Sequence, residues 1–181
     1  MPVERCGRCS APHLERPTLL APFDYHFPVD RILAAFKYRA DLTLLPVLRH
    51  WLENMPVETI ASAALVPVPL HPFRFRRRGF NQATLIARLV AERCGGSVLD
   101  NAVVRRRHTA PQVGLTATER RRNLRDAFAV PEPLAHRHIC IVDDVATTGA
   151  TLQAVATSLR RSGVRSVSAF CLAYAGAGVY R

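Results

Sequence analysis

The chain has 181 residues, of which 49% are hydrophobic and 22% charged, a balance typical of a globular domain with its own core. Lys and Arg total 25 against 14 Asp and Glu, so the formal net charge is +11, which favours polyanionic partners such as nucleic acid, nucleotides or phosphorylated sugars. No apolar run approaches the roughly 20 residues of a membrane-spanning helix, and MPVERCGRCS lacks a signal-peptide core, so we expect a cytoplasmic protein without membrane insertion.

The cationic side chains are almost all arginine, because Lys37 is the only lysine in the chain. Such a bias can reflect genome composition instead of selection for guanidinium groups. The charge alone therefore leaves a nucleic-acid partner as an open alternative.

Five cysteines are scattered along the chain. An odd number in a reducing compartment does not describe a disulfide framework. Cys140 and Cys171 lie within apolar runs, so we expect both to be buried hydrophobic side chains. Cys6 and Cys9 form a C-x-x-C pair, which supplies half of the four ligands that a structural zinc site needs.

The N-terminal third divides into two predicted segments. Residues 1–22 are polar and rich in proline, and we expect an arm or a partial module there. Residues 23–58 are predicted to form a small helical segment. Its apolar residues indicate one short helix around 32–36 and a second over 44–52, with Pro46 near the start of the second.

Residues 59–181 form the predicted main domain. The run AALVPVPL, residues 63–70, is expected to be a buried strand that leaves the sheet into a loop. The strongly basic stretch HPFRFRRRGF is predicted to be that loop. A helix is predicted over NQATLIARLVAERCGG, with Asn81 as its N-cap and Gly95 at its end.

The second half of the domain continues the alternation of strands and helices. VLDNAVVRRR contains a short predicted strand, and the polar, basic stretch after it contains a helix over about 118–126. HICIVDD is an apolar strand that stops at two acids, as expected of a central parallel strand. GATLQAVATSLRRSG is a predicted helix and VRSVSAFCLAYA another strand. The order predicts an α/β fold with a mainly parallel sheet flanked by helices.

The stretch IVDDVATTGAT, residues 141–151, places two adjacent carboxylates before a turn rich in threonine. Ligands bind at the carboxyl ends of parallel strands, where Asp143 and Asp144 would lie. A helix N-terminus follows, and its free N–H groups and positive dipole attract phosphate. The residues of that turn are Thr147, Thr148, Gly149, Ala150 and Thr151. A ribose 5-phosphate satisfies both halves, whereas the alternative is an ordinary strand-to-helix turn.

This stretch resembles the phosphoribosyl-pyrophosphate (PRPP) signature of type I phosphoribosyltransferases. The resemblance implies that Asp143 and Asp144 are the catalytic pair that holds the ribose hydroxyls, and that residues 147–151 hold the 5-phosphate. It also implies Mg²⁺ as a cofactor that bridges the pyrophosphate and the ribose. The reaction would be attack by a nitrogen nucleophile on the anomeric carbon as pyrophosphate leaves.

Two further segments are similar to the ComF family of competence-associated proteins. They are VPVPLHPFRFRRRGFNQA at 66–83 and the spaced set Thr109, Gln112, Leu115, Arg120 and Asn123. The resemblance extends from about Phe23 to the C-terminus, and the segment Arg74–Gln82 is specific to the family. It implies a type I phosphoribosyltransferase fold with a small N-terminal arm or hood. It also implies a link to natural transformation, single-stranded DNA and a DNA-uptake helicase as a partner.

The basic loop after the first predicted strand would cradle pyrophosphate in a phosphoribosyltransferase. Guanidinium groups match phosphate oxygens in pairs, and they stabilise the charge that develops as pyrophosphate leaves. A second basic stretch, RRRHTAPQVGLTATERRRN, is a candidate lid that would keep water from the activated sugar. The candidate ligands are Arg74, Arg76, Arg78, Arg105 and Arg107. The alternative for both stretches is an exposed basic surface.

Aromatic residues interleave with the arginines of the first loop, at Phe73, Phe75 and Phe80. Aromatic rings among basic residues can stack unpaired bases, or they can anchor a loop in the core. The candidate nucleic-acid-binding residues are Arg77, Phe80 and Arg120.

The ComF resemblance also bears on the cysteine pair. In ComF relatives a pair at this place is the second half of a zinc module, so Cys6 and Cys9 form an incomplete zinc site. We expect the chain to begin inside that module, and another C-x-x-C upstream in the reading frame would test this. His13 could be a third ligand.

Three functions remain open from the sequence. The first is a phosphoribosyltransferase of unknown acceptor. The second is a binding module that senses PRPP or binds single-stranded DNA without turnover. The third, a nucleotide-salvage enzyme, is disfavoured because no base-recognition loop is evident and Gly176–Arg181 is too short to form a hood.

Overall fold

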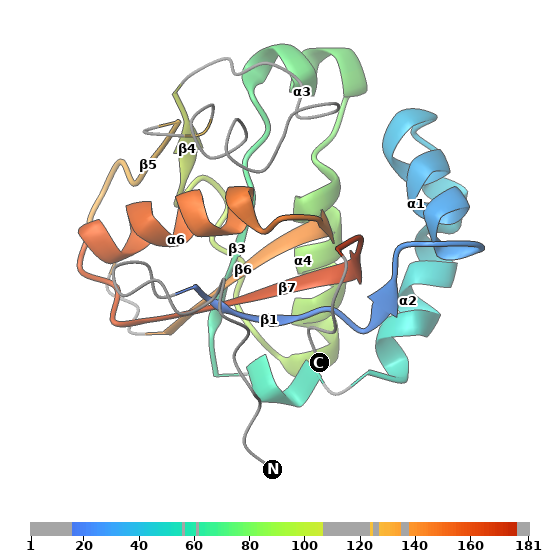
Figure 1. The fold of residues 1–181 in the computed structure, drawn as a ribbon, viewed down its shortest axis with the longest axis horizontal. Coiled ribbons are helices and arrows are strands. Elements are labelled where there is room, and N and C mark those ends of the chain that lie inside the picture. Colours follow the sequence, from blue (N-terminus) through green and yellow to red (C-terminus); the bar gives the residue numbers. More distant parts are fainter. Residues whose placement is uncertain are drawn as a thin grey trace.

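The computed structural model describes residues 16–55, 57–60, 62–106, 124, 127–134 and 138–176. In this part of the chain a parallel sheet lies between two layers of helices (Figure 1). The strand order is β1-β7-β6-β3, and β2 also pairs with β7. The mainly parallel α/β fold expected from the sequence is therefore confirmed.

All pairs in this sheet are parallel. Its strands are β1 (Thr18–Leu20), β2 (Phe23–Asp24), β3 (Ala64–Pro67), β6 (His138–Ala146) and β7 (Ser166–Tyr174). Two short strands, β4 (Val104–Arg105) and β5 (Phe128–Ala129), form a separate antiparallel pair.

The central strand β6 runs further than the sequence suggested. It pairs with β3 on one side and with β7 on the other. We expected the acids to end it, but Asp143 pairs with Cys171 and Ala146 with Tyr174, so that expectation is wrong. Pairing along nearly all of β7 holds the two acids inside the strand.

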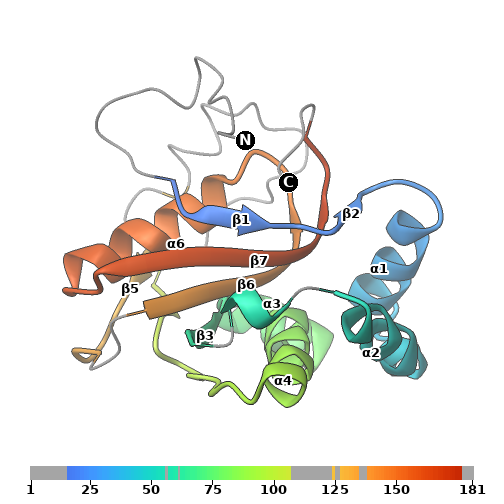
Figure 2. The same cartoon turned by 90° about the horizontal axis from the view of Figure 1, so that it is seen from below.

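Helices cover the two faces of the sheet unequally (Figure 2). One face packs against α1 (Val29–Tyr38), α2 (Leu45–Glu53) and α4 (Gln82–Cys94), and the other against α6 (Ala150–Arg161). Two 3₁₀ turns, η1 (Leu42–Leu44) and η2 (Val57–Ile60), complete the first layer.

Alternate residues of β6 pack in these two cores, because successive side chains of a strand point to opposite faces of the sheet. Ile139 and Ile141 pack in the core that contains α6. Cys140 and Val142 pack in the core that contains α1, α2 and α4. Cys140 and Cys171 are fully buried, as predicted.

The ends of α4 follow the sequence signals. The Asn81 side chain accepts a hydrogen bond from the Ala83 N–H at 3.1 Å, and Gly95 ends the helix in the left-handed region at φ 69°. Both ends were predicted. The short helices α1 and α2 also lie where the apolar pattern placed them, with Pro46 in the first turn of α2.

The basic stretch after β3 is a helix and not the expected loop. It forms α3 (Pro72–Arg78), in which Pro72 opens the first turn and the His71 ring accepts a hydrogen bond from the Phe73 N–H at 3.2 Å. Gly79 ends α3 at φ 85°. Local capping thus overrides the loop-like appearance of the sequence.

The expected arm is also partly sheet. Residues 1–15 lie outside the described residues, but Thr18–Leu20 pairs with Ser168–Phe170 of β7. The boundary that we expected after residue 22 therefore does not separate this part from the main sheet. The predicted helix over 118–126 lies outside the described residues except for Leu124, which is buried.

The outer edges of the sheet are short. Beyond β3, Leu65 exchanges backbone hydrogen bonds with Ser97 and Leu99, both at 2.8 Å. On the other edge, Pro22 lies between β1 and β2. Within the described ranges, no helix is long and apolar enough to cross a membrane.

Candidate functional site

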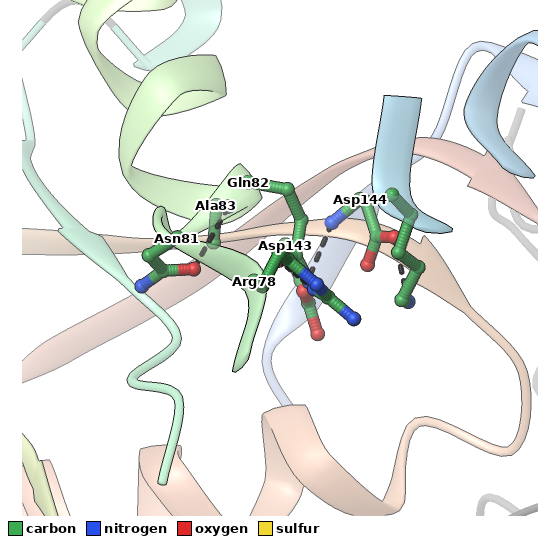
Figure 3. A network of polar contacts seen from close by, with 7 residues as sticks. Arg78, Asn81, Gln82, Ala83, Asp143 and Asp144 are labelled. Carbon is green, nitrogen blue, oxygen red and sulfur yellow. Dashed lines mark hydrogen bonds and ion pairs between the residues drawn. The ribbon is translucent and has the colours of Figure 1, made fainter. Parts of the chain in front are cut away.

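The two acids of β6 lie on opposite faces of the sheet. Asp143 shares the face of Ile139 and Ile141, and Asp144 shares the face of Cys140 and Val142. The carboxylates are thus neighbours in sequence but lie on different faces of the sheet. Figure 3 shows the two side chains diverging from the strand.

Asp144 forms a buried ion pair with α1. Its Oδ2 lies 2.7 Å from Nζ of Lys37, and the Asp144 side chain is only 2% exposed. Burial alone would raise the pKa of Asp144, but the charge and hydrogen bond of Lys37 lower it. Burial alone would likewise lower the pKa of Lys37, but the charges of Asp144 and Asp143 raise it. At neutral pH the pair is therefore ionised.

Asp143 has different surroundings from Asp144. Its Oδ1 accepts a hydrogen bond from the Asp144 N–H at 2.9 Å. Burial and the adjacent Asp144 charge raise the pKa of Asp143 to about 8, although Lys37 opposes the shift. Asp143 is therefore the acid of the pair that binds a proton more readily.

The connection from β6 to α6 is built as a phosphate-binding turn would be. Gly149 is the N-cap residue at φ 71° and ψ 6°, and it supplies no side-chain cap to α6. Thr148 Oγ1 lies 3.4 Å from the Ala150 nitrogen, and Thr147 and Thr151 flank the turn. An added Cβ on Gly149 would meet no atom within 4 Å, so the backbone conformation, not crowding, calls for glycine.

Arg78 brings a cation to the carboxylates from α3. Its guanidinium donates a hydrogen bond to Gln82 Oε1, and Figure 3 shows it between Gln82 and Asp143. Burial lowers the pKa of Arg78, and the Asp144 charge counteracts this. Its guanidinium carbon also lies 5.9 Å from the centre of the Tyr38 ring.

Arg105 approaches the site from β4. Its pKa is lowered to about 10 by burial and by the neighbouring charge of Arg74, and the charge of Asp143 counteracts this. Its guanidinium carbon lies 5.5 Å from the centre of the Phe128 ring. Arg105 is therefore an electrostatic neighbour of both Arg74 and Asp143.

The arginines of α3 separate onto different faces. Arg74 and Arg78 are one turn apart; Arg78 interacts with the charge of Asp144, and Arg74 lies near the cationic groups of Arg78 and Arg105. Arg76 instead lines a separate groove of about 470 Å³ between α3 and residues 100–103, together with Phe75 and Asn81. Arg77 is exposed. The structure thus places Arg78 beside the acids and Arg74 beside Arg78 and Arg105, and it separates Arg76 from them.

The aromatic residues of this segment separate in the same way. Phe73 and Phe75 are 60% and 49% exposed. Phe80 instead packs on the core, with its ring centre 5.6 Å from that of Phe36. This placement favours the anchoring alternative for Phe80 and leaves the two helix residues facing solvent.

Residues 76–181 match the phosphoribosyl transferase domain family. The chain is also similar to Competence protein F of Haemophilus influenzae, with 36% identity over 84% of this chain and 64% of that protein. It is 34% identical to the DNA utilization protein YhgH of Escherichia coli K12, over 92% of this chain and 76% of that protein.

The chain belongs to the ComF family. The similarity to Competence protein ComFC of Streptococcus pneumoniae is lower, at 28% identity over 84% of this chain and 66% of that protein. This ComF chain spans 64% of the length of Competence protein F. Its domain has the type I phosphoribosyltransferase fold that the sequence predicted.

Several candidates of this ComF protein lie outside the described residues. They are Cys6, Cys9, His13, Arg107 and Arg120, together with the spaced set over 109–123. The zinc half-site and the distal part of the lid therefore stay predictions.

Two contributors to the site were missed from the sequence. Lys37 lies 107 residues before its partner Asp144, beyond the reach of any local motif. The available signal was its being the only lysine in an arginine-rich chain. Gln82 was read as a helix residue, yet it is 3% exposed and its side chain holds Arg78.

Proposed function

We propose that this ComF protein binds PRPP together with Mg²⁺ at the carboxyl end of β6. The observation that carries the proposal is the meeting of three features: the adjacent carboxylates of Asp143 and Asp144, a glycine-opened helix start five residues after Asp144, and two guanidinium groups from other elements. A ligand with ribose hydroxyls between two phosphate groups matches all three.

The 5-phosphate is assigned to the start of α6. Backbone N–H groups of the first turn lack partners within the helix and point along its axis, where the dipole is positive. Thr147, Thr148 and Thr151 add hydroxyl groups around the turn. The 12-residue length of α6 gives it a full helix dipole.

The ribose hydroxyls are assigned to the acid pair. Asp143 is the more accessible of the two, and a hydroxyl group can donate to its carboxylate or accept from its protonated form. Asp144 is engaged with Lys37 through Oδ2. Asp143 is therefore the acid that we expect to make the first contact with the sugar.

The pyrophosphate is assigned to Arg74, Arg78 and Arg105. Guanidinium groups match pairs of phosphate oxygens and keep their charge despite burial. When a nitrogen nucleophile attacks the anomeric carbon, the carbon–oxygen bond breaks and the electron pair leaves with pyrophosphate. Cations fixed beforehand at that position stabilise the departing charge.

Mg²⁺ fits this donor set as a companion of the ligand. It prefers oxygen ligands in octahedral geometry and usually binds through one or two carboxylates plus substrate phosphates. Asp143 offers such oxygens, whereas Asp144 is occupied by Lys37. When bound, the ion would neutralise charge on the pyrophosphate.

Calorimetric titration with PRPP and Mg²⁺ tests the proposal. We expect saturable binding by the wild type and its loss in the Asp143→Asn/Asp144→Asn double variant. Asp24→Asn, a change at an exposed acid in β2, is the matched control and should bind like the wild type. A wild type that fails to bind would contradict the proposal.

A second function, single-stranded nucleic-acid binding, is favoured by the outer faces of α3. Phe73 and Phe75 are exposed there, and no ion pair of Arg76 or Arg77 with an acid occurs within the described ranges. Exposed rings and unpaired cations suit stacked bases and a phosphate backbone. We propose this face, with the adjoining groove, as the nucleic-acid surface.

Fluorescence anisotropy with a labelled thymidine oligomer tests this second function. The Phe73→Ala/Phe75→Ala variant should bind the oligomer at least about tenfold more weakly, since stacking contributes about 1–3 kcal/mol per base. Its PRPP affinity should not change. Arg49→Gln on α2 serves as a control for loss of a surface cation. Equal binding by all three proteins would contradict the proposal.

A further inference from the structure

The contact between Lys37 and Asp144 joins the N-terminal helical layer to the acid pair. Lys37 lies in the last turn of α1, and α1 lies beside the tips of β6 and β7 in both views (Figure 1, Figure 2). The Nζ–Oδ2 distance is 2.7 Å, and the Lys37 side chain is only 26% exposed. Nothing in the signature of β6 and α6 provides for this partner.

The negative charge of two carboxylates would disfavour the binding of a phosphorylated ligand. Two adjacent ionised carboxylates would repel PRPP, which carries its negative charge on both sides of the ribose. Lys37, whose Nζ lies 2.7 Å from Asp144 Oδ2, cancels the charge of Asp144. The acid pair therefore presents hydroxyl-binding oxygens with the charge of only one carboxylate uncompensated by Lys37.

The same turn of α1 also reaches the pyrophosphate side of the site. The Tyr38 ring has Lys37 Nζ 6.0 Å from its centre and the Arg78 guanidinium carbon 5.9 Å from it. Tyr38 is itself 67% exposed, so its ring borders the site instead of filling the core. Lys37 thus stands where α1, α3 and β6 meet.

We propose that Lys37 is a positioning residue of the phosphoribosyl site, which neutralises Asp144 and fixes the end of α1 over the carboxyl edge of β6. This inference rests on the proposed PRPP function. Lys37 acts through Asp144 and α1, and Asp143 remains the acid that meets the sugar.

Two substitutions separate the charge of Lys37 from its bulk. Lys37→Met keeps an unbranched apolar chain and removes the charge, and Lys37→Arg keeps the charge. Arg31→Met is the matched control, because Arg31 lies on the same helix with its side chain 81% exposed and its loss changes the net charge equally.

Calorimetric titration with PRPP and Mg²⁺ gives the first readout. We expect about tenfold weaker binding or more for Lys37→Met, because the uncompensated Asp144 charge repels the ligand. Lys37→Arg should stay within about threefold of the wild type, and Arg31→Met should match it. A purely structural role would not be rescued by arginine while an apolar chain of similar length fails.

The single lysine allows a second readout on the wild-type sequence. Reductive methylation with ¹³C-formaldehyde labels only Lys37 and the N-terminal amine. Saturation with PRPP and Mg²⁺ should shift the Lys37 methyl resonance in the NMR spectrum. This measurement holds even if Lys37→Met does not fold.

The outcomes separate the two proposals. Wild-type binding with an unchanged affinity in Lys37→Met, or with an unmoved Lys37 resonance, would overturn the role of Lys37 and leave PRPP binding intact. Failure of the wild type to bind PRPP would overturn the proposed function and this inference with it.

Discussion

Asp143 and Asp144 are adjacent in sequence, but their carboxyl groups have different surroundings and different pKa values. Asp144 is buried and has the Lys37 ammonium group at 2.7 Å, whereas Asp143 is half-buried. The pKa of Asp144 is lowered by Lys37 despite burial, while burial and the Asp144 charge raise the pKa of Asp143 to about 8. The divergence of the side chains across the sheet makes this difference possible.

Because the pKa of Asp143 is raised, Asp143→Asn should increase the stability of the folded protein, and the increase should depend on pH. The folded chain holds this proton up to about pH 8, whereas an unfolded Asp loses it near 3.9, so Asp143 lowers stability progressively between those values. At pH 9 the variant should melt about 3 °C or more above the wild type, and at pH 4 within about 1 °C of it. Thermal unfolding followed by circular dichroism measures this. A difference that does not vary with pH would contradict the assignment.

Asp144→Asn should have the opposite effect on stability. It leaves the Lys37 ammonium group without its partner carboxylate, so we expect the free energy of unfolding to fall by about 2–3 kcal/mol. The loss is smaller than for a fully buried pair because the Lys37 side chain is partly exposed. Urea denaturation at pH 7 gives the free energy of unfolding. Adding Lys37→Met should recover part of the loss. An additive loss in the double variant would show that the two side chains are not coupled.

At the scale of single elements, α3 is a helix whose faces carry different chemistry. One face carries Arg78, which lies near the acids, and Arg74 one turn away, and the others carry exposed aromatic rings, Arg76 and Arg77. The helix is held by its own caps at His71 and Gly79. A short capped helix can therefore present two binding surfaces at once.

Arg78→Gln and Arg77→Gln should separate these surfaces. We expect Arg78→Gln to weaken PRPP binding about tenfold, because a charge-assisted contact to pyrophosphate is lost. Arg77→Gln should leave PRPP binding unchanged and reduce the salt dependence of oligonucleotide binding by about one counterion. Calorimetry and anisotropy over a salt series measure the two. Identical effects of both substitutions would contradict the division of α3.

The start of α6 depends on the backbone of Gly149. Its φ of 71° is strained for any residue with a Cβ, so Gly149→Ala should lower the free energy of unfolding by about 1–2 kcal/mol. The strained turn should also bind the 5-phosphate less tightly. Gly163→Ala, at φ 96° just beyond the C-terminal end of α6, is the control. It should lose stability similarly but keep its PRPP affinity in calorimetry. Equal loss of affinity in both would contradict a phosphate site at Gly149.

At the scale of the whole molecule, two cores share one sheet and the proposed ligand site lies where both reach its carboxyl edge. A ligand there touches α1, α3, β6 and α6, so it should stabilise the fold. When the free concentration of PRPP with Mg²⁺ is 100 times its dissociation constant, binding should add about 2.7 kcal/mol to the free energy of unfolding, which corresponds to a rise in Tm of about 5–10 °C. Differential scanning fluorimetry measures this. An equal rise with Mg²⁺ alone would contradict PRPP as the ligand.

Much of the fold could be predicted from the sequence because local signals and burial agree. Asn81 and Gly95 mark the ends of α4, and apolar runs mark β3, β6 and β7. The errors arose where distant pairing decides. Thr18–Leu20 becomes a strand because β7 offers an edge, and β6 continues through its acids because β7 runs alongside.

The part of the site that is one continuous stretch of sequence could be predicted. The residues that folding brings to it from distant parts of the chain could not. Asp143 to Thr151 form one stretch with a clear physical logic. Lys37 comes from a helix whose position depends on packing against the sheet, which no local pattern encodes. The distribution of Arg74, Arg76 and Arg78 over different faces likewise required the helix that replaced the expected loop.

The short, interrupted borders of the sheet have a consequence for behaviour in concentrated solution. A strand border with open N–H and C=O groups invites another polypeptide to add to it, which leads to aggregation. Here Ser97 and Leu99 take up the hydrogen bonds of Leu65, and Pro22 removes a donor from the opposite border. The native protein should therefore resist amyloid-like stacking, and its aggregation on heating should follow global unfolding instead of preceding it.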